Sequence, residues 1–501
     1  MTDRPFDAPA RVREIFDLPP LARLIDRLRT KAAGSRPFVL ETGLAVGASA
    51  RWHILGAYPV GEARVEGGEW CTSVGSTVCR GTTDPWDALA AWWRAWGNVA
   101  TQGAWEVSPG AGTSMGAASM GAASVGAASM DPTSMNLEFW GGAVGYLGYE
   151  LGTRLEAIPV REEAEIATPD LHLHLYDEVL LLDRDSERAY FVHRGRAQQR
   201  EREWWVGAVE GEGLTPGDAA QAALGVEEVS LAESEYLRLV SEVRERIADG
   251  EVYEMNLCRR HALRGAPSAW ELHRRLRAWQ PVPYGALLPW DPVAVISASP
   301  ECFLRRRGAE VLTRPIKGTA ARSHDPAENR ARAQALLASD KQRAELAMII
   351  DLERNDLGRV CTPGSVEVVE EAVVEEYSTV LHTVATVRGR LGADHDPWPL
   401  LRATFPGGSI TGAPKIAAMK VIRQLEPVAR KVYTGAIGWL APNGDLDLSI
   451  AIRTLFQHDG TTYYSVGSAI TWDSDPVDEL RELEAKGAAI RAALLGQPRV
   501  E

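Results

Sequence analysis

The stretch SLAESEYLRLVSEVRERIADG, Ser230–Gly250, carries the pattern from which the fold class follows. Ser230 and Glu233 form an S-x-x-E capping box ahead of an apolar stripe at positions 236, 240, 243 and 247, which predicts a helix that Gly250 ends. From there to the C-terminus, short β-like runs alternate irregularly with a few long helices. No G-x-G-x-x-G or P-loop motif interrupts them. We therefore expect an α+β protein with large antiparallel or mixed sheets.

Toward the N-terminus, two segments have a clear period. WDALAAWWRAWGNV, Trp86–Val99, has helical spacing, and Val179–Val192 places two apolar runs around a polar turn, which predicts a β-hairpin. FWGGAVGYLGY, Phe139–Tyr149, is rich in glycine and aromatic residues and is typical of a closely packed strand.

Two other segments lack any apolar period. The five-residue repeat GAASM-GAASV-GAASM lies in a stretch, about 107–135, that we expect to be a disordered insert. A second soft stretch, 211–225, predicts the boundary between an N-terminal region, 1–225, and a C-terminal domain, 226–497.

Composition excludes several classes of protein. The chain has 501 residues and a formal net charge of -14, which disfavours nucleic-acid binding. Its longest charge-free run is Gly, Ala, Ser and Met, too weakly apolar to span a membrane, and its start resembles no secretory signal. Five scattered cysteines form no C-x-x-C pair. We expect a cytoplasmic protein with no nucleic-acid or membrane partner.

Acidic residues recur on two of the expected helices. Glu345 stands among apolar neighbours in 339–357, and Glu479 and Glu482 lie three apart in 475–494. Carboxylates on one helix face suit Mg²⁺, which takes one or two protein carboxylates together with water and substrate oxygens. The alternative is a solvated charged face held by i,i+4 pairs.

Three segments could hold an anion. FPGGSITGAPK, Phe405–Lys415, is a glycine-rich loop with hydroxyls at Ser409 and Thr411 and a cation at Lys415, although such loops are often only turns. Gly467-Ser468-Ala469 is expected to be a small-residue bend after a strand. Arg453 lies in an apolar run, where an arginine is usually paired or holds an anion bidentately.

RPIKGT, Arg314–Thr319, carries the sharpest chemical signal. Lys317 follows a proline and an isoleucine and precedes a glycine. A lysine in an apolar, constrained setting can act as an amine nucleophile if its pKa is lowered. The alternative is a surface lysine in a turn.

Together these segments resemble the chorismate-utilising enzymes: anthranilate synthase component I, aminodeoxychorismate synthase component I and isochorismate synthase. The resemblance runs nearly continuously over 230–495, through VYEMNLCRR, SASPECFLRR, RPIKGT, FPGGSITGAPK and LDLSIAIRT, and more weakly through RPFVLETG near the N-terminus. It implies the anthranilate synthase component I fold, with large sheets in a sandwich and helices packed outside.

The resemblance also implies residue roles. Glu345 and Glu482, with Glu479 behind them, would hold Mg²⁺ against a substrate carboxylate, and Glu301 would be the general acid for the C4 hydroxyl. His382 would sit by the ring. Residues implied to contact or surround chorismate are Asn256, Ser409, Thr411, Lys415, Tyr433, Arg453, Gly467 and Ser468, and Leu40, Glu41 and Thr42 match a tryptophan pocket of relatives.

Lys317 separates the members of the family. Its position resembles aminodeoxychorismate synthases, in which the lysine attacks C2 as hydroxide leaves C4 and ammonia then adds at C4. Glu254 stands where isochorismate synthases carry a lysine base. The resemblance therefore implies a transaminase-class enzyme that makes 4-amino-4-deoxychorismate for 4-aminobenzoate and folate synthesis.

This activity needs a source of ammonia. No cysteine here resembles a glutaminase nucleophile, so the resemblance implies a separate glutamine amidotransferase subunit as partner. Two alternatives stay open: an anthranilate synthase component I, which would release pyruvate, and a catalytically silent tryptophan-binding subunit.

Overall fold

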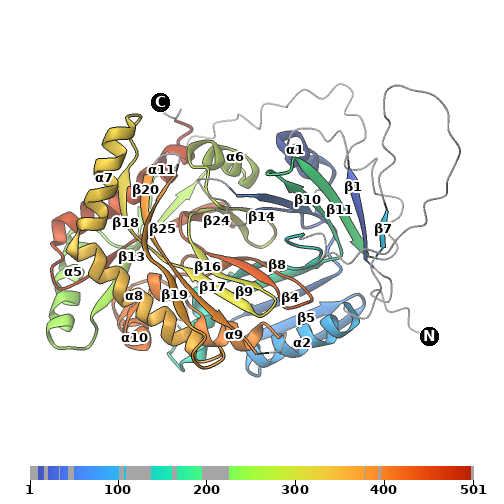
Figure 1. The fold of residues 1–501 in the computed structure, drawn as a ribbon, viewed down its shortest axis with the longest axis horizontal. Coiled ribbons are helices and arrows are strands. Elements are labelled where there is room, and N and C mark those ends of the chain that lie inside the picture. The colour runs from blue at the N-terminus through green and yellow to red at the C-terminus, as the bar shows by residue number, and fades with distance from the viewer. Residues whose placement is uncertain are drawn as a thin grey trace, which may run out of the picture.

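The computed structural model describes residues 10–15, 21–32, 34–42, 50–100, 106–108, 137–160, 166–194, 225–377, 380–392 and 396–497. These residues form two large β-sheets packed face to face, with helices on the outer faces (Figure 1). The expected α+β sandwich is confirmed. Neighbouring strands are antiparallel except for β1 and β7, so the first sheet is mixed.

The first sheet, sheet A, has 13 strands within the described residues. In spatial order they are β12 (Glu228–Val229), β13 (Glu254–Arg264), β25 (Thr461–Ile470), β24 (Thr454–His458), β15 (Ala294–Ser299), β14 (Tyr284–Pro289), β2 (Phe38–Thr42), β3 (Trp52–Gly56), β10 (Glu178–Asp183), β11 (Arg188–Arg194), β1 (Ala10–Ile15) and β7 (Glu106–Ser108), with β21 (Gly412–Ala413) beside β13.

The second sheet, sheet B, has 12 strands in the same described part of the chain. They are β18 (Ile316–Ala321), β20 (Val380–Arg390), β17 (Glu310–Arg314), β16 (Cys302–Arg307), β23 (Leu446–Ile450), β22 (Ala436–Leu440), β8 (Gly142–Leu147), β9 (Leu171–Tyr176), β4 (Gly61–Glu66), β5 (Glu69–Val74) and β6 (Thr77–Gly81), with β19 (Glu367–Glu376) beside β20.

Helices cover both outer faces. Sheet A packs against α1 (Leu21–Lys31), α5 (Glu233–Ala248), α6 (Ala269–Trp279), α10 (Lys415–Leu425) and α11 (Pro476–Leu494). Sheet B packs against α2 (Pro85–Ala100), α8 (Asp340–Gly358) and α9 (Trp398–Thr404). The remaining helices are α3 (Tyr149–Leu155), α7 (Pro326–Ala338) and the 3₁₀ turn η1 (Gly408–Ile410). None of the described helices is long and apolar enough to cross a membrane.

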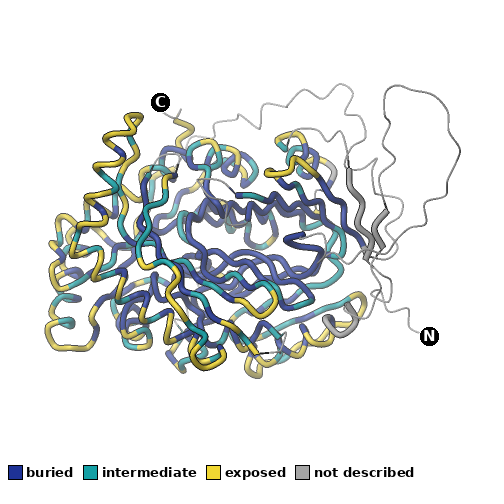
Figure 2. The backbone as a smooth tube through the Cα atoms, viewed as in Figure 1, coloured by how far each residue is buried: buried dark blue, intermediate teal, exposed yellow. Residues whose placement is uncertain are grey.

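The core therefore has three layers. The middle layer joins Leu40 and Ile54 of sheet A to Val144 and Trp439 of sheet B. Alternation along each strand sends one set of side chains into this layer and the other set outward to the helices. Figure 2 shows the consequence: the sheets are buried along most of their length and exposure is concentrated on the outer helices.

Several local predictions are confirmed. The helix expected at Trp86–Val99 is α2, and the hairpin expected at Val179–Val192 is β10 with β11. The strand expected at Phe139–Tyr149 is β8, although it is shorter, and Tyr149 already belongs to α3.

The prediction of a capping box at Ser230 is wrong. Helix α5 begins at Glu233, its N-cap is Ala232, and no side chain caps it. The hydroxyl of Ser230 instead accepts a hydrogen bond from the backbone N–H of Arg260, 2.9 Å away, and so joins this segment to β13. The Ser230 hydroxyl therefore makes a tertiary contact in place of the local capping interaction.

The predicted boundary at 211–225 lies outside the described residues except for its last residue. The predicted insert at 107–135 lies outside them except for its first two residues, which belong to β7. Both halves of the chain contribute strands to both sheets: β14 of the C-terminal half pairs with β2, and β22 pairs with β8.

Candidate active site

The candidate residues gather where the chain passes between the two sheets. Glu301 lies between β15 of sheet A and β16 of sheet B, and Arg453 lies between β23 of sheet B and β24 of sheet A. The two crossings are joined by a hydrogen bond from the N–H of Ala298 to the carbonyl of Arg453, 3.1 Å. Arg453, in the apolar run of the sequence, occupies a bend with φ of 50°.

Lys317 on β18 faces Glu254 on β13, so a pair of buried charges joins the two sheets. The ammonium donates to Glu254 Oε1 at 2.6 Å, and both side chains are buried. The surface-lysine alternative is therefore wrong. The condition stated for a nucleophile, a lowered pKa, is not met in the free protein: burial acts to lower the pKa of Lys317, but Glu254, Glu345 and Glu301 outweigh it and raise the pKa.

Glu301 is a buried carboxyl group whose pKa is raised toward neutrality. Burial is the largest influence and raises its pKa to about 7, against the stabilising hydroxyl of Ser409 and the charges of Lys317 and Arg453. Ser409 donates to Glu301 Oε1 at 2.5 Å. A substantial fraction of Glu301 therefore carries a proton near neutral pH and can donate it.

His382 on β20 borders the same space. Its Nδ1 is 3.0 Å from the hydroxyl of Thr319, and its Nε2 is 3.4 Å from the guanidinium of Arg453. Burial and that guanidinium lower its pKa to about 3, so the ring is neutral. Burial also lowers the pKa of Arg453 to about 10, which leaves this group a cation at neutral pH.

β13 and β25 supply the opposite wall. The predicted bend at Gly467-Ser468-Ala469 is wrong, because β25 continues through it and pairs Gly467 with Cys258 of β13. A Cβ on Gly467 would lie 2.7 Å from the Cys258 sulfur and 3.2 Å from the Tyr433 hydroxyl. Only glycine fits this close packing. The hydroxyl of Ser468 donates to the carbonyl of Glu479, 3.4 Å away.

The loop Phe405–Lys415 folds into η1 and β21 and reaches the site through Ser409. Asn256 donates to the carbonyl of Ser409 at 3.2 Å, while the Thr411 hydroxyl bonds back to Gly407. The loop's backbone N–H groups were predicted to approach an anion, but the N–H of Gly408 donates to buried Glu353. Lys415 donates to Asp356 and to the carbonyl of Thr404, so its charge is directed beneath the loop.

An acidic edge, formed by Glu345 on α8 and by Glu479 and Glu482 on α11, lies beside Lys317. The charge of Glu345 raises the pKa of Lys317, and the charge of Lys317 lowers the pKa of Glu482. Lys341 lies 3.9 Å from Glu345 and 3.6 Å from Glu479, and Lys486 pairs with Glu482 at 2.7 Å.

These carboxylates suit a divalent cation by their chemistry. Oε2 of Glu479 is buried and has no hydrogen-bond partner among the described residues, which leaves one oxygen free to bind a metal. Glu345, Glu479 and Glu482 do not bring one oxygen each within 4.8 Å of one another in the described structure. Lys341 lies within 4 Å of Glu345 and Glu479, so a bound cation would compete with its ammonium for these carboxylates.

The residues matched to a tryptophan pocket divide between two layers. Leu40 and Thr42 face the middle layer, where Thr42 donates to Asp447 at 2.9 Å. Glu41 faces α6 and forms an ion pair with Arg277. Whether tryptophan binds there stays a prediction.

Sequence reasoning missed the groups that support the site from below. Arg430 is buried and donates to the carbonyls of Ile410 and Asn256 and to Glu426, and Glu426 accepts from the N–H of Cys258. The i,i+4 spacing of Glu426 and Arg430 was the available signal, but such spacing is common on solvated helices.

A lysine beside a carboxylate, a protonated carboxyl group, an arginine and an acidic edge can bind a polyanion and displace a hydroxyl group from it. The fold and these groups define the class, and a family model agrees: the chain belongs to the chorismate binding enzymes, with residues 92–492 matched.

Individual relatives carry two different names. The chain is 39% identical to aminodeoxychorismate synthase component 1 of Klebsiella aerogenes over 69% of this chain and 76% of that one. It is also 39% identical to anthranilate synthase component 1 of Streptomyces coelicolor, over 71% and 73%. The crystal structure of anthranilate synthase component I from Streptococcus pneumoniae superposes with a TM-score of 0.71 at 28% identity, covering 90% of this chain and 94% of that one.

Proposed function

We propose that the chain converts chorismate and ammonia to 4-amino-4-deoxychorismate, as an aminodeoxychorismate synthase component 1. The observation that carries the proposal is Lys317, buried in the site with its ammonium 2.6 Å from Glu254. An amine nucleophile at this point distinguishes amination through a covalent adduct from other reactions of the same substrate.

The proposed reaction balances its protons through two carboxylates. Lys317 passes a proton to Glu254, and the free amine attacks C2 of chorismate. The C4–oxygen bond breaks as Glu301 donates its proton, and water leaves. Ammonia then adds at C4 as the bond between C2 and Lys317 breaks. Glu254 returns its proton to the Lys317 amine, and the new ammonium group at C4 returns one proton to Glu301, so both carboxyl groups end as they began. The pKa of Glu301, about 7, supports its role as acid.

Substrate binding is proposed to use the cations and the acidic edge together. Arg453 would contact a substrate carboxylate from the sheet crossing, and Glu345, Glu479 and Glu482 would hold Mg²⁺. When bound, Mg²⁺ would neutralise a second substrate carboxylate and fix its position. A protein with a net charge of -14 needs such local positive charge to bind a dianion.

The term component 1 in the relatives' names supports a second, separate component. We propose that this partner is a glutamine amidotransferase that supplies ammonia. Free ammonium salts would then replace the partner in an assay of this chain alone.

One alternative has direct support. A relative named anthranilate synthase component 1 is also 39% identical to this chain, and a solved anthranilate synthase component I shares the fold. That activity would also aminate chorismate, but it would release pyruvate.

Product analysis separates the two activities. The full chain is incubated with chorismate, Mg²⁺ and an ammonium salt at alkaline pH, and products are identified by mass spectrometry with pyruvate assayed in parallel. We expect 4-amino-4-deoxychorismate without pyruvate. Anthranilate with an equal amount of pyruvate would overturn the proposal in favour of the alternative.

A further inference from the structure

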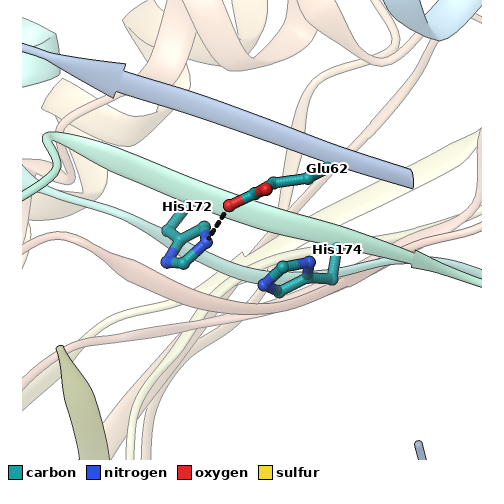
Figure 3. Close-up of side chains that lie close together, drawn as sticks. All are labelled: Glu62, His172 and His174. Carbon is teal, nitrogen blue, oxygen red and sulfur yellow. Dashed lines mark hydrogen bonds and ion pairs between the residues drawn. The ribbon is translucent and has the colours of Figure 1, made fainter. Parts of the chain in front are cut away.

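A compact group of metal-ligating side chains lies in sheet B, outside the site described above. Glu62 is on β4, and His172 and His174 are on the neighbouring β9. Glu62 is in register with His174, and the two histidines, two residues apart, project to the same face of the strand. Figure 3 shows the two imidazoles side by side with the Glu62 carboxylate next to them.

The ligand atoms are close and incompletely satisfied. One atom from each of the three residues lies within 4.8 Å of the others. His174 is 3% exposed, and neither of its ring nitrogens has a hydrogen-bond partner among the described residues, although the Gly61 backbone is near enough to affect its pKa. His172 is fully buried, with Nδ1 unpartnered and Nε2 2.7 Å from Glu62 Oε1.

The protonation states suit metal binding. Burial lowers the pKa of His174 to about 3 and also lowers the pKa of His172, so both rings are neutral at pH 7. The hydrogen bond from His172 is the main reason why the pKa of Glu62 falls to about 2. Neutral imidazoles and an ionised carboxylate are the forms that bind transition metals.

We propose that Glu62, His172 and His174 bind a divalent transition-metal ion, with Zn²⁺ preferred. Two imidazoles and one carboxylate are a zinc ligand set, and three protein ligands leave a fourth position for water. Carboxylates alone suit Mg²⁺, whereas imidazole nitrogens favour Zn²⁺ and its neighbours. This inference is independent of the proposed function.

The surroundings supply a wall on one side and access on the other. Trp290 packs edge-on against both histidines, with ring centroids 5.4 Å from His172 and 4.6 Å from His174. The Glu62 side chain is 40% exposed, so an ion can enter from solvent on that side. Arg36 and Arg64 lie near enough to oppose a cation, but Arg64 is paired with Glu66.

Binding requires only small local movements. Zinc bonds of about 2.0–2.1 Å in a tetrahedron place ligand atoms roughly 3.4 Å apart. Nε2 of His172 and Oε1 of Glu62, now 2.7 Å apart, would separate slightly, and the three ligand atoms already lie within 4.8 Å of one another. Nε2 of His172 must release the proton that it donates to Glu62, or pass it to the unpartnered Nδ1. The ion would then link β4 to β9 through side chains as well as through the backbone.

The test uses the full chain, stripped with a chelator and titrated with Zn²⁺ in an excess of Mg²⁺ so that the acidic edge near Lys317 is occupied. Bound zinc is counted after gel filtration for the wild type, His174→Gln and Glu62→Gln. His324→Gln, which removes an exposed imidazole elsewhere, is the control. We expect one retained equivalent and a raised Tm for the wild type and the control, with both effects lost in the other two variants.

Two results would overturn the proposal: a wild type that retains no zinc, or ligand variants that retain as much as the wild type. Because a buried histidine variant can fail to fold, the wild type is also loaded with Co²⁺. Visible d–d absorption typical of four- or five-coordinate cobalt is expected, and its absence would equally reject the site.

Discussion

At the scale of single residues, the site depends on how burial and neighbouring charges divide protons between Lys317 and Glu301. Lys317 is a cation in the free protein because Glu254, Glu345 and Glu301 outweigh its burial. Glu301 keeps its proton to about pH 7 because its burial outweighs its partners. In the proposed reaction the proton of Lys317 passes to Glu254 within the site, whereas Glu301 loses its proton to solvent above about pH 7, so loss of the Glu301 proton is expected to limit activity at alkaline pH.

The variant Ser409→Ala tests the proposed role of Glu301 as general acid. The Ser409 hydroxyl stabilises ionised Glu301, so removing it raises the pKa of Glu301 further. The descending limb of kcat/KM against pH is expected to move to higher pH. The maximal rate is expected to fall about tenfold or more, because a hydrogen bond to a charged group contributes about 1.5–3 kcal/mol. The profile is measured at constant free ammonia.

The control is Ser297→Ala, a buried serine on β15 whose hydroxyl bonds to Thr454 rather than to a carboxylate. It should leave the limb in place. A limb that stays fixed, or moves to lower pH, in Ser409→Ala would show that Glu301 is not the group that titrates.

At the scale of elements, the acidic edge of α8 and α11 is held by lysines in the absence of metal. Lys341 is half-exposed and lies within 4 Å of both Glu345 and Glu479. Lys341→Met removes a cation that competes for these carboxylates, so the Mg²⁺ concentration for half-maximal activity is expected to fall about fivefold, equal to about 1 kcal/mol.

Arg343→Met is the matched control, since Arg343 is on the same helix but pairs with Asp340 outside the site. It should not alter the Mg²⁺ requirement. An unchanged or increased requirement in Lys341→Met would contradict a metal site at these carboxylates.

The link between β2 and α6 is a stability element. Glu41 is buried, and despite that burial His53 and Arg277 lower its pKa to about 2. A depressed carboxyl pKa stabilises the fold above the unfolded value, about 4.3, and the benefit is lost as pH falls toward 2. Glu41→Gln is expected to lower the free energy of unfolding at pH 7 by about 2 kcal/mol, after allowance for screening at half-exposed Arg277.

Denaturant unfolding at pH 7 and at the lowest pH where the wild type folds measures this, with exposed Glu69→Gln as control. The gap between the wild type and Glu41→Gln should narrow below about pH 4.5. A gap that stays constant or widens would mean that the ion pair is not its source.

Elements with a strong local period were predictable, and long-range partners were not. Helix α2 and the β10–β11 hairpin follow from spacing alone. Ser230 shows the limit: its hydroxyl binds the backbone of β13 instead of capping α5, because the tertiary contact is available only in the fold. The bend predicted at Gly467 was wrong for the same reason, because pairing with β13 keeps these small residues within strand β25.

The site shows the same division. RPIKGT pointed to Lys317, but its partner Glu254 is 63 residues away and the pair forms only where the two sheets meet. Lys415 was expected to face an anion, yet it is directed to Asp356, a residue of another helix that spacing could not connect to it. Residue types were readable from the sequence, whereas the direction of each side chain depended on the fold.

At the scale of the whole molecule, the chain crosses between the two sheets at the point where the chemistry is expected. Glu301 and Arg453 lie on the two crossings, and Lys317 and Glu254 bridge the sheets from either side. The same sandwich serves relatives with different products, so the lysine bridge is the feature that sets this chain's proposed reaction.

The most direct test of covalent capture by Lys317 is peptide mass mapping of the full chain, quenched in acid after brief exposure to chorismate and Mg²⁺ without ammonia. We predict a chorismate adduct, less one water, on the peptide containing Lys317, lost on adding ammonium, absent in Lys317→Ala, and accompanied by a fall in that variant's kcat of at least about a hundredfold. No adduct in the wild type, together with undiminished amination by Lys317→Ala, would contradict the account.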